Sequence, residues 1–123
     1  MTTTPSLKKV LIVDDNAGMR QMIRFMLPYF SGEVIECADS QEAINLYRTH
    51  RPALVLMDLR LKTGDGITTT KNIKQSFPSA NIIMVSSYGD NLFKKAAKQA
   101  GATAYVLKDN LSEVVNILQQ YIS

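Results

Sequence analysis

The chain has 123 residues, of which 46% are hydrophobic, and a formal net charge of +3 at pH 7. This length suits one compact domain with a sizeable core. Every apolar stretch falls well short of the roughly 20 residues of a membrane-spanning helix. The start, Met-Thr-Thr-Thr-Pro-Ser, lacks the basic and apolar regions of a signal peptide. We therefore expect a cytoplasmic protein with no membrane role and a flexible N-terminus over residues 1–7.

Cysteine and charge usage exclude further classes. Cys37 is the only cysteine, which rules out an internal disulfide and a metal site made of cysteines alone. It lies in an apolar run, so we expect a buried thiol. The fourteen basic and eleven acidic residues are scattered, with no basic run interleaved with aromatic residues. Direct nucleic acid binding by this domain is therefore not expected.

Strand-like and helical patterns alternate from the start of the chain. After a first strand at about 8–13, apolar residues recur at helical spacing from Met19 to Met26, which predicts one helix face in the core. A second strand is expected at about 33–37. Asp39 and Glu42 then have the spacing of a capping box at the start of a second helix.

The alternation continues to the end of the chain. The remaining strands are expected at about 53–57, 81–85 and 103–107. The helix after Gly66 is the weakest of the predicted helices, because Thr68-Thr69-Thr70 is a β-branched run. Asp90 and Asn91 are candidate caps for the next helix, which Gly101 ends. The last helix extends from Leu111 to Ile122, with Asn110 and Glu113 at capping-box spacing.

Five strands alternating with five helices predict one α/β domain over residues 8–122, with a doubly wound, five-stranded parallel sheet. The near-continuous apolar strands agree, since parallel strands are buried on both faces. Ligands bind such sheets outside the carboxyl ends of the strands. The polar residues expected there are Asp14, Asp15, Asp58, Ser86 and Lys108.

These five residues have the chemistry of a phosphoryl and metal site. Carboxylates about 5 Å apart repel by roughly 3 kcal/mol per pair at an effective dielectric constant near 20. A hard divalent cation removes that repulsion, and oxygen ligands without histidine or cysteine indicate Mg²⁺, with Mn²⁺ as the alternative. Ser86 and Lys108 suit the oxygens of a phosphoryl group. Asp58 is the candidate nucleophile, which would form an aspartyl phosphate.

The chain resembles the receiver domain of bacterial two-component response regulators, from about Lys8 to Tyr121. The segments that carry the resemblance are Val13-Asp14-Asp15-Asn16 with Arg20, Leu56-Met57-Asp58 with Asp65-Gly66, Val85-Ser86-Ser87, and Gly101-Ala102 with Tyr105 and Lys108. The resemblance implies a flavodoxin-like strand order, 2-1-3-4-5, and a role in phosphorelay signal transduction.

The resemblance also implies roles for the site residues. Asp58 would accept a phosphoryl group from a sensor histidine kinase, a phosphotransfer protein or a small donor such as acetyl phosphate. The domain would catalyse only its own phosphorylation and dephosphorylation, so it would not be an enzyme. Asp15, Asp58 and the main-chain carbonyl of Arg60 would ligate Mg²⁺, and Asp14 would act mostly through bound water.

Ser86 and Lys108 would each bind a phosphoryl oxygen, and Ser86 and Tyr105 would form the switch. The readout would be a population shift on the surface of the fourth helix, fifth strand and fifth helix, where a downstream protein would bind or a phosphorylation-dependent homodimer would form. Lys94 and Lys98 on the fourth helix would attract an acidic partner or simply be solvated.

Departures from the family pattern concern the loops. Asp109 follows Lys108 where proline is usual, as in receivers of LuxR-type regulators, and we expect a trans peptide bond there because a non-proline cis bond costs about 2.5–4 kcal/mol. Arg60 and Tyr88 lie two residues beyond Asp58 and Ser86. Our hypothesis is that these bulky side chains hinder the attacking water and slow dephosphorylation.

Four alternatives stay open. Asp15 or Asn16 would each make an N-cap for the first helix. A flavodoxin-like cofactor binder has this architecture, although Asp14-Asp15 would repel a phosphate. An aspartyl phosphatase would carry Asp-x-Asp after its first strand. The last alternative is a receiver-fold protein-interaction module that works without phosphorylation.

Overall fold

In the computed structural model of the protein, residues 8–27 and 32–122 are described, with side chains up to Gln120. The N-terminus over residues 1–7, expected to be flexible, lies outside the described residues. The elements in chain order are β1 (Lys9–Val13), α1 (Ala17–Phe25), β2 (Glu33–Cys37), α2 (Ser40–His50), β3 (Leu54–Met57), α3 (Gly66–Ser76), β4 (Ile82–Ser86), α4 (Asn91–Ala100), β5 (Ala104–Leu107), a short 3-10 helix (Lys108–Asn110) and α5 (Ser112–Ile122).

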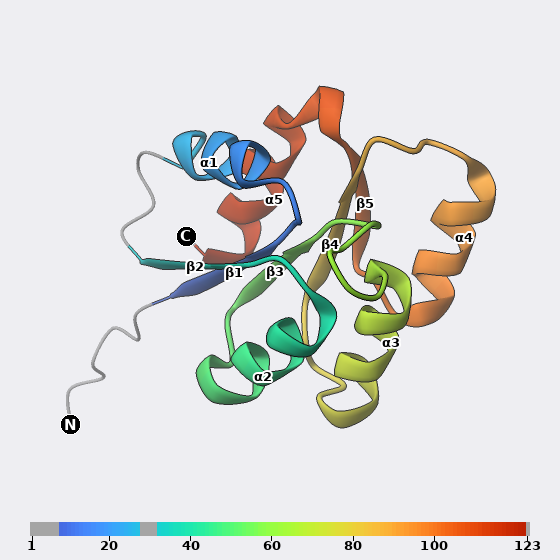
Figure 1. Ribbon diagram of the computed structural model, residues 1–123. Helices are drawn as coiled ribbons and strands as arrows, with labels where there is room; N and C mark the ends of the chain where they lie inside the picture. Colours follow the sequence, from blue (N-terminus) through green and yellow to red (C-terminus); the bar gives the residue numbers. More distant parts are fainter. Residues whose placement is uncertain (1–7, 28–31, 123) are drawn as a thin grey trace.

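The strands form one parallel sheet in the order β2-β1-β3-β4-β5. Helices α1 and α5 cover one face, and α2, α3 and α4 cover the other (Figure 1). The predicted α/β fold and its flavodoxin-like strand order are therefore confirmed. No helix among residues 8–27 and 32–122 is long and apolar enough to cross a membrane.

The core is two apolar clusters, one on each face of the sheet. Successive side chains of a strand point to opposite faces. In β1, Leu11 and Val13 join the cluster under α2, α3 and α4, whereas Val10 and Ile12 join the cluster under α1 and α5. Both sets are fully buried, which explains why β1 has four consecutive apolar residues. Cys37 is buried as well, and burial raises the pKa of its thiol to about 12.

The helix caps differ in part from the sequence expectation. Asn16, rather than Asp15, caps α1 by accepting a hydrogen bond from the Met19 amide. Asp39 caps α2, as predicted, through the Glu42 amide at 2.8 Å. Asp90 occupies the N-cap position of α4, but its side chain makes no capping hydrogen bond.

The predicted capping box at Asn110 and Glu113 is wrong. Residues 108–110 form the short 3-10 helix, so α5 begins only at Ser112. The Asn110 amide group instead donates to the Glu113 carboxylate at 3.1 Å. The turn that follows β5 displaces the helix start by one residue, from Leu111 to Ser112.

Helix α3 forms in spite of its threonine run. Thr69 and Thr70 are fully buried. The Thr69 hydroxyl donates to the main-chain carbonyl of Asp65 at 2.6 Å and pairs with the Ser40 hydroxyl at 2.7 Å. Tertiary contacts thus outweigh the small intrinsic penalty of β-branched residues in a helix.

Candidate functional site

The five polar residues predicted at the strand ends lie at one edge of the sheet. Asp14 and Asp15 follow β1, Asp58 follows β3, Ser86 ends β4 and Lys108 follows β5. Strands β1, β3, β4 and β5 are consecutive neighbours, so their carboxyl ends form one row. The parallel hydrogen-bond pattern also continues one residue past β1 and β3, since the Asp14 amide donates to Cys37 O at 3.1 Å and the Asp58 amide to Val13 O at 2.8 Å. The sheet itself therefore fixes two of the acids.

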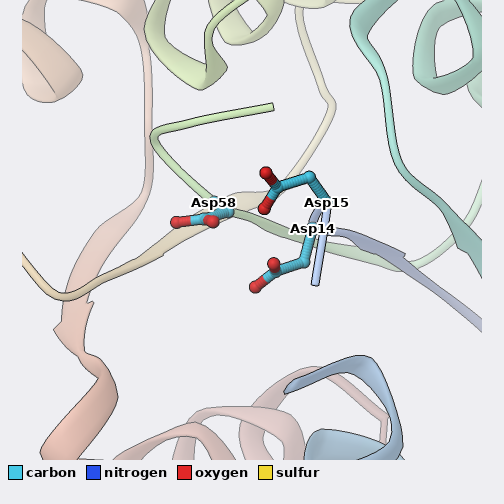
Figure 2. Close-up of side chains that lie close together, drawn as sticks. All are labelled: Asp14, Asp15 and Asp58. Carbon is cyan, nitrogen blue, oxygen red and sulfur yellow. The ribbon is translucent and has the colours of Figure 1, made fainter. Parts of the chain in front are cut away.

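The three carboxylates form a compact cluster. Asp14, Asp15 and Asp58 each offer an oxygen within 4.8 Å of the others, and Figure 2 shows the three side chains converging. Asp14 and Asp58 are 2% and 7% exposed, whereas Asp15 faces solvent. Since Asn16 caps α1, Asp15 has no capping role. Mg²⁺ binds oxygen ligands and keeps several of its waters. A cluster of carboxylates that is open on one side meets both requirements.

Lys108 is the cation nearest to this cluster. Its ammonium group lies 3.0 Å from Asp14 Oδ2 and 3.1 Å from Asp58 Oδ2. Burial on its own would lower the pKa of Lys108, but the hydrogen bonds to Asp14 and Asp58 outweigh it, so the pKa is raised. One protonated lysine among three ionised carboxylates leaves two negative charges, which one divalent cation would balance.

The Asp58 carboxyl is electrostatically strained. Burial, followed by the nearby charge of Asp14, raises its pKa from 3.8 to about 6, against the opposing effects of Lys108 and the Leu59 amide. The two oxygens have different partners: Oδ1 accepts from the Leu59 amide at 2.8 Å and Oδ2 from Lys108. The side chain is thus held in one orientation and remains largely ionised at neutral pH.

The two predicted switch residues are connected through Tyr88, a link that the sequence did not reveal. Ser86 is fully buried, and its hydroxyl oxygen accepts from the Tyr88 amide at 3.0 Å. The Tyr105 hydroxyl donates to the Tyr88 carbonyl at 2.5 Å. Ser86 and Tyr105 are therefore connected through the main chain of one residue.

Arg60 lies beside the same loop. Its guanidinium stands over the Tyr88 ring, 4.9 Å from the centroid. The predicted metal-binding role of its main-chain carbonyl is not tested by these contacts and stays a prediction. The Lys108–Asp109 peptide bond is trans, as expected, since the described residues contain no cis bond.

Two supporting residues have roles that only the structure reveals. A Cβ atom at Gly66 would lie 2.0 Å from the Asp58 carbonyl oxygen, so α3 can start here only with glycine. Arg20 donates to the Asp14 carbonyl at 2.6 Å and to Glu36 at 3.0 Å, and Arg24 holds the other Glu36 oxygen. In the sequence, Gly66 and Arg20 stood out only as members of the family motifs. Those motifs gave no physical reason for either residue.

Comparison with known proteins agrees with this geometry. The chain is 40% identical over 113 residues to the chemotaxis protein CheY of Bacillus subtilis, which covers 88% of this chain and 94% of CheY. It is 41% identical over 107 residues to the B. subtilis transcriptional regulatory protein YhcZ, covering 85% of this chain but only 50% of YhcZ.

Solved structures show the same fold. A two-component response regulator of the LuxR family from Aurantimonas sp. SI85-9A1 superimposes with a TM-score of 0.85 at 32% identity, covering 95% of this chain and 86% of that one. CheY from Borrelia burgdorferi, in a complex with CheX, BeF3 and Mg²⁺, gives 0.84 at 26% identity, covering 94% and 90%. The family model described as the response regulator receiver domain matches residues 10–119. The chain therefore belongs to the response regulator receiver domains of two-component systems.

Proposed function

We propose that this receiver domain is a phosphoacceptor whose Asp58 takes a phosphoryl group from a sensor histidine kinase or a phosphotransfer protein. The observation that carries the proposal is the place of Asp58, whose buried carboxylate clusters with Asp14 and Asp15 and contacts the Lys108 ammonium. Receiver domains are signalling modules rather than enzymes, and the proposed chemistry is limited to the domain's own phosphorylation and dephosphorylation.

The reaction would depend on Mg²⁺, with Mn²⁺ as a substitute. Asp15, Asp58 and the main-chain carbonyl of Arg60 would ligate the cation, and Asp14 would act through bound water. The cation would supply charge neutralisation for the transferring phosphoryl oxygens. The B. burgdorferi CheY complex, which contains Mg²⁺ and BeF3, supports the choice of Mg²⁺.

An Asp58 oxygen would attack the phosphorus of the donor, and the bond from phosphorus to the donor histidine nitrogen would break with its electron pair on that nitrogen. Lys108 would exchange its bond to Asp58 for a phosphoryl oxygen while keeping Asp14, 3.0 Å away, as a tether. The Ser86 hydroxyl would donate to another phosphoryl oxygen. The Lys108 ammonium already contacts the Asp58 carboxylate, so it needs little rearrangement.

The output would be a change of the α4–β5–α5 surface. Ser86 would move toward the phosphoryl group and shift Tyr105 through Tyr88. A downstream protein, or a second copy in a phosphorylation-dependent homodimer, would then bind this surface. Leu92 on α4 is 80% exposed, and Lys94 and Lys98 of the same helix are exposed as well, so the helix offers both an apolar contact and positive charges.

Intact-protein mass spectrometry after incubation with acetyl phosphate tests the proposal. One phosphoryl adduct is expected with Mg²⁺, none with chelator, and none for Asp58→Asn. Asp109→Asn, which removes an exposed acid next to Lys108, should keep the adduct. If wild-type protein gains no adduct and also fails to bind beryllofluoride with Mg²⁺, the alternative, an interaction module that works without phosphorylation, is favoured.

A further inference from the structure

A cavity of about 390 Å³ lies at the edge of the sheet opposite to Asp58. Ala53 and Asn81, which directly precede β3 and β4, both line it. The other walls come from the end of α2 and the end of α3, and they include Tyr47, Arg51, Pro52, Phe77 and Ser79. This volume is within the range of sites that bind small molecules. The proposed phosphorylation uses none of these residues.

The Arg51 guanidinium is fixed in place, but part of it has no partner. It lies over the Phe77 ring, 4.1 Å from the centroid, and its Nε donates to the Arg48 carbonyl at 3.3 Å. The two Nη groups form no hydrogen bond or ion pair with any residue in the described part of the chain. Two parallel N–H groups of this kind are what a carboxylate needs for a bidentate pair.

Tyr47 supplies a second donor without a partner. Its side chain is 6% exposed and packs on Phe77, with ring centroids 5.1 Å apart. No described residue contacts its hydroxyl by a hydrogen bond, yet residues 8–27 and 32–120 contain no buried side-chain oxygen without a partner. The hydroxyl must therefore reach open space, and Tyr47 lines the cavity. Burial raises the pKa of Tyr47, against the opposing charge of Arg51, so the phenol can donate at neutral pH.

The electrostatics around the cavity favour an anion. The carbonyl ends of α2 and α3 each carry about half a negative charge. Arg48 and Lys74 lie in the last turns of these helices, and Arg51 follows α2, so three full positive charges outweigh that effect. Lys74 donates to two main-chain carbonyls after α3, at 2.6 and 3.0 Å. Among the lining residues that the structure describes, Arg51 alone is charged, which matches one negative charge.

The backbone of Arg51 adopts a conformation that favours glycine. Arg51 is the C-cap of α2, with a φ of 45° and a ψ of 58°. It is the one non-glycine residue with positive φ in the described ranges. Glycine is the usual residue at such a helix end, and strained backbone is concentrated at binding sites. Glycine here would relieve the strain but remove the charge from the cavity.

We propose that this cavity binds a small monocarboxylate with an apolar body. The Arg51 Nη groups pair with the carboxylate, and the Tyr47 hydroxyl donates to one of its oxygens. Pro52 and Phe77 supply apolar contacts for the body of the ligand. Acetate would leave most of the volume empty, and a dianionic phosphate would lack a second cation.

NMR titration of the main-chain amides tests the proposal, with benzoate as the probe and the neutral benzamide, of similar shape, as its control. Benzoate is expected to shift the amides of Arg51, Ala53, Phe77 and Asn81 in a saturable way. Benzamide should bind about tenfold more weakly or less, because it lacks the charge-assisted pair. Equal binding of the two compounds, or no saturable shift with benzoate, would overturn the proposal. Inorganic phosphate binding as tightly as benzoate would overturn the choice of a monocarboxylate.

Variants of Arg51 separate binding from folding. Arg51→Gly suits the positive φ, so the protein should stay folded, while benzoate binding should weaken on the order of tenfold or more. Arg51→Lys should give an intermediate affinity, because lysine keeps the charge without the planar pair of donors. Arg48→Gln, which removes an exposed charge outside the cavity, is the control and should change the affinity by less than about twofold. Unchanged binding in Arg51→Gly contradicts the site.

The Tyr47 hydroxyl has its own test. Tyr47→Phe keeps the ring that packs on Phe77 and removes only the hydroxyl, so the urea midpoint should stay near that of the wild type. Benzoate affinity should fall about fivefold, the effect of losing one hydrogen bond. Wild-type affinity in this variant would show that the hydroxyl does not contact the carboxylate.

Discussion

The position of Asp58 lowers the stability of the folded protein, although the same position suits the proposed chemistry. Its carboxylate is buried beside Asp14, and these two effects raise its pKa to about 6. Lys108 relieves only part of the repulsion, because a single ammonium group is shared by Asp14 and Asp58. The residue proposed to accept the phosphoryl group is therefore also a residue that destabilises the metal-free fold.

Asp58→Asn is expected to stabilise the metal-free protein at pH 7.5 by about 1–3 kcal/mol, since it removes a buried charge while Lys108 keeps Asp14. Urea unfolding in the presence of chelator measures the difference. Asp109→Asn, at an exposed site, is the matched control and should change stability by less than about 0.5 kcal/mol. A destabilised Asp58→Asn protein would contradict the electrostatic strain.

The same strain predicts a pH dependence with a definite sign. Between the ordinary pKa of 3.8 and the raised pKa of about 6, the folded protein binds more protons at Asp58 than the unfolded chain does. The contribution of Asp58 to the free energy of unfolding therefore falls as pH rises through this window. The advantage of Asp58→Asn over wild type should accordingly shrink between pH 7.5 and pH 5. An advantage that grows toward pH 5 would refute the raised pKa.

At the scale of elements, the start of α3 is built against Asp58, the proposed phosphoacceptor. The Gly66 amide donates to Leu59 O at 2.7 Å, and Asp65 caps the helix through the Thr68 amide at 2.8 Å. The glycine brings the first turn of the helix against the Asp58 carbonyl. The helix thereby fixes the main chain from which the Asp58 and Arg60 side chains extend.

Gly66→Ala should destabilise the protein by about 2 kcal/mol, because an added Cβ atom would lie 2.0 Å from a main-chain oxygen that cannot easily yield. Gly18→Ala in α1 is the control: there the nearest atom, 3.2 Å away, belongs to the Asn16 side chain. Urea unfolding of both variants provides the comparison. Equal effects of the two substitutions would show that the approach of α3 to Asp58 is unimportant.

At the scale of the whole molecule, charge is divided between the site and the outer surface. Helices α3 and α4 contain five lysines and no acidic residue, whereas the arginines of α1 are engaged by Glu36. The site itself gathers three carboxylates around one lysine. A chain with a net charge of +3 thus presents a local negative site that attracts a cation.

Mg²⁺ should therefore stabilise the whole fold, because a ligand that binds only the folded state raises the free energy of unfolding. At a concentration one hundred times the dissociation constant, the gain is about 2.7 kcal/mol. Thermal unfolding with Mg²⁺, compared with KCl at equal ionic strength, measures it. Asp15→Asn should lose most of the increase in melting temperature. An equal increase with KCl would show general screening instead of a site.

The sequence by itself determined the α/β fold and the five residues at the strand ends. Buried parallel strands are apolar at every position, and their carboxyl ends share one edge, so the position of Asp14, Asp58 or Lys108 along the chain already gives its place in space. The buried state of Cys37 followed in the same way. These conclusions need only the local periodicity of the apolar residues and the rule that the carboxyl ends of parallel strands lie at one edge of the sheet.

Only the tertiary structure decided the contacts between loops and between helices. The threonine run predicted a poor helix, and α3 is stabilised by tertiary contacts such as the bond from Thr69 to Ser40 of another helix. The join from Ser86 through Tyr88 to Tyr105, and the position of Arg60 over Tyr88, depend on how the loops after β3 and β4 lie beside β5. Such contacts join residues far apart in the chain, and their geometry exists only once the sheet has placed the loops side by side.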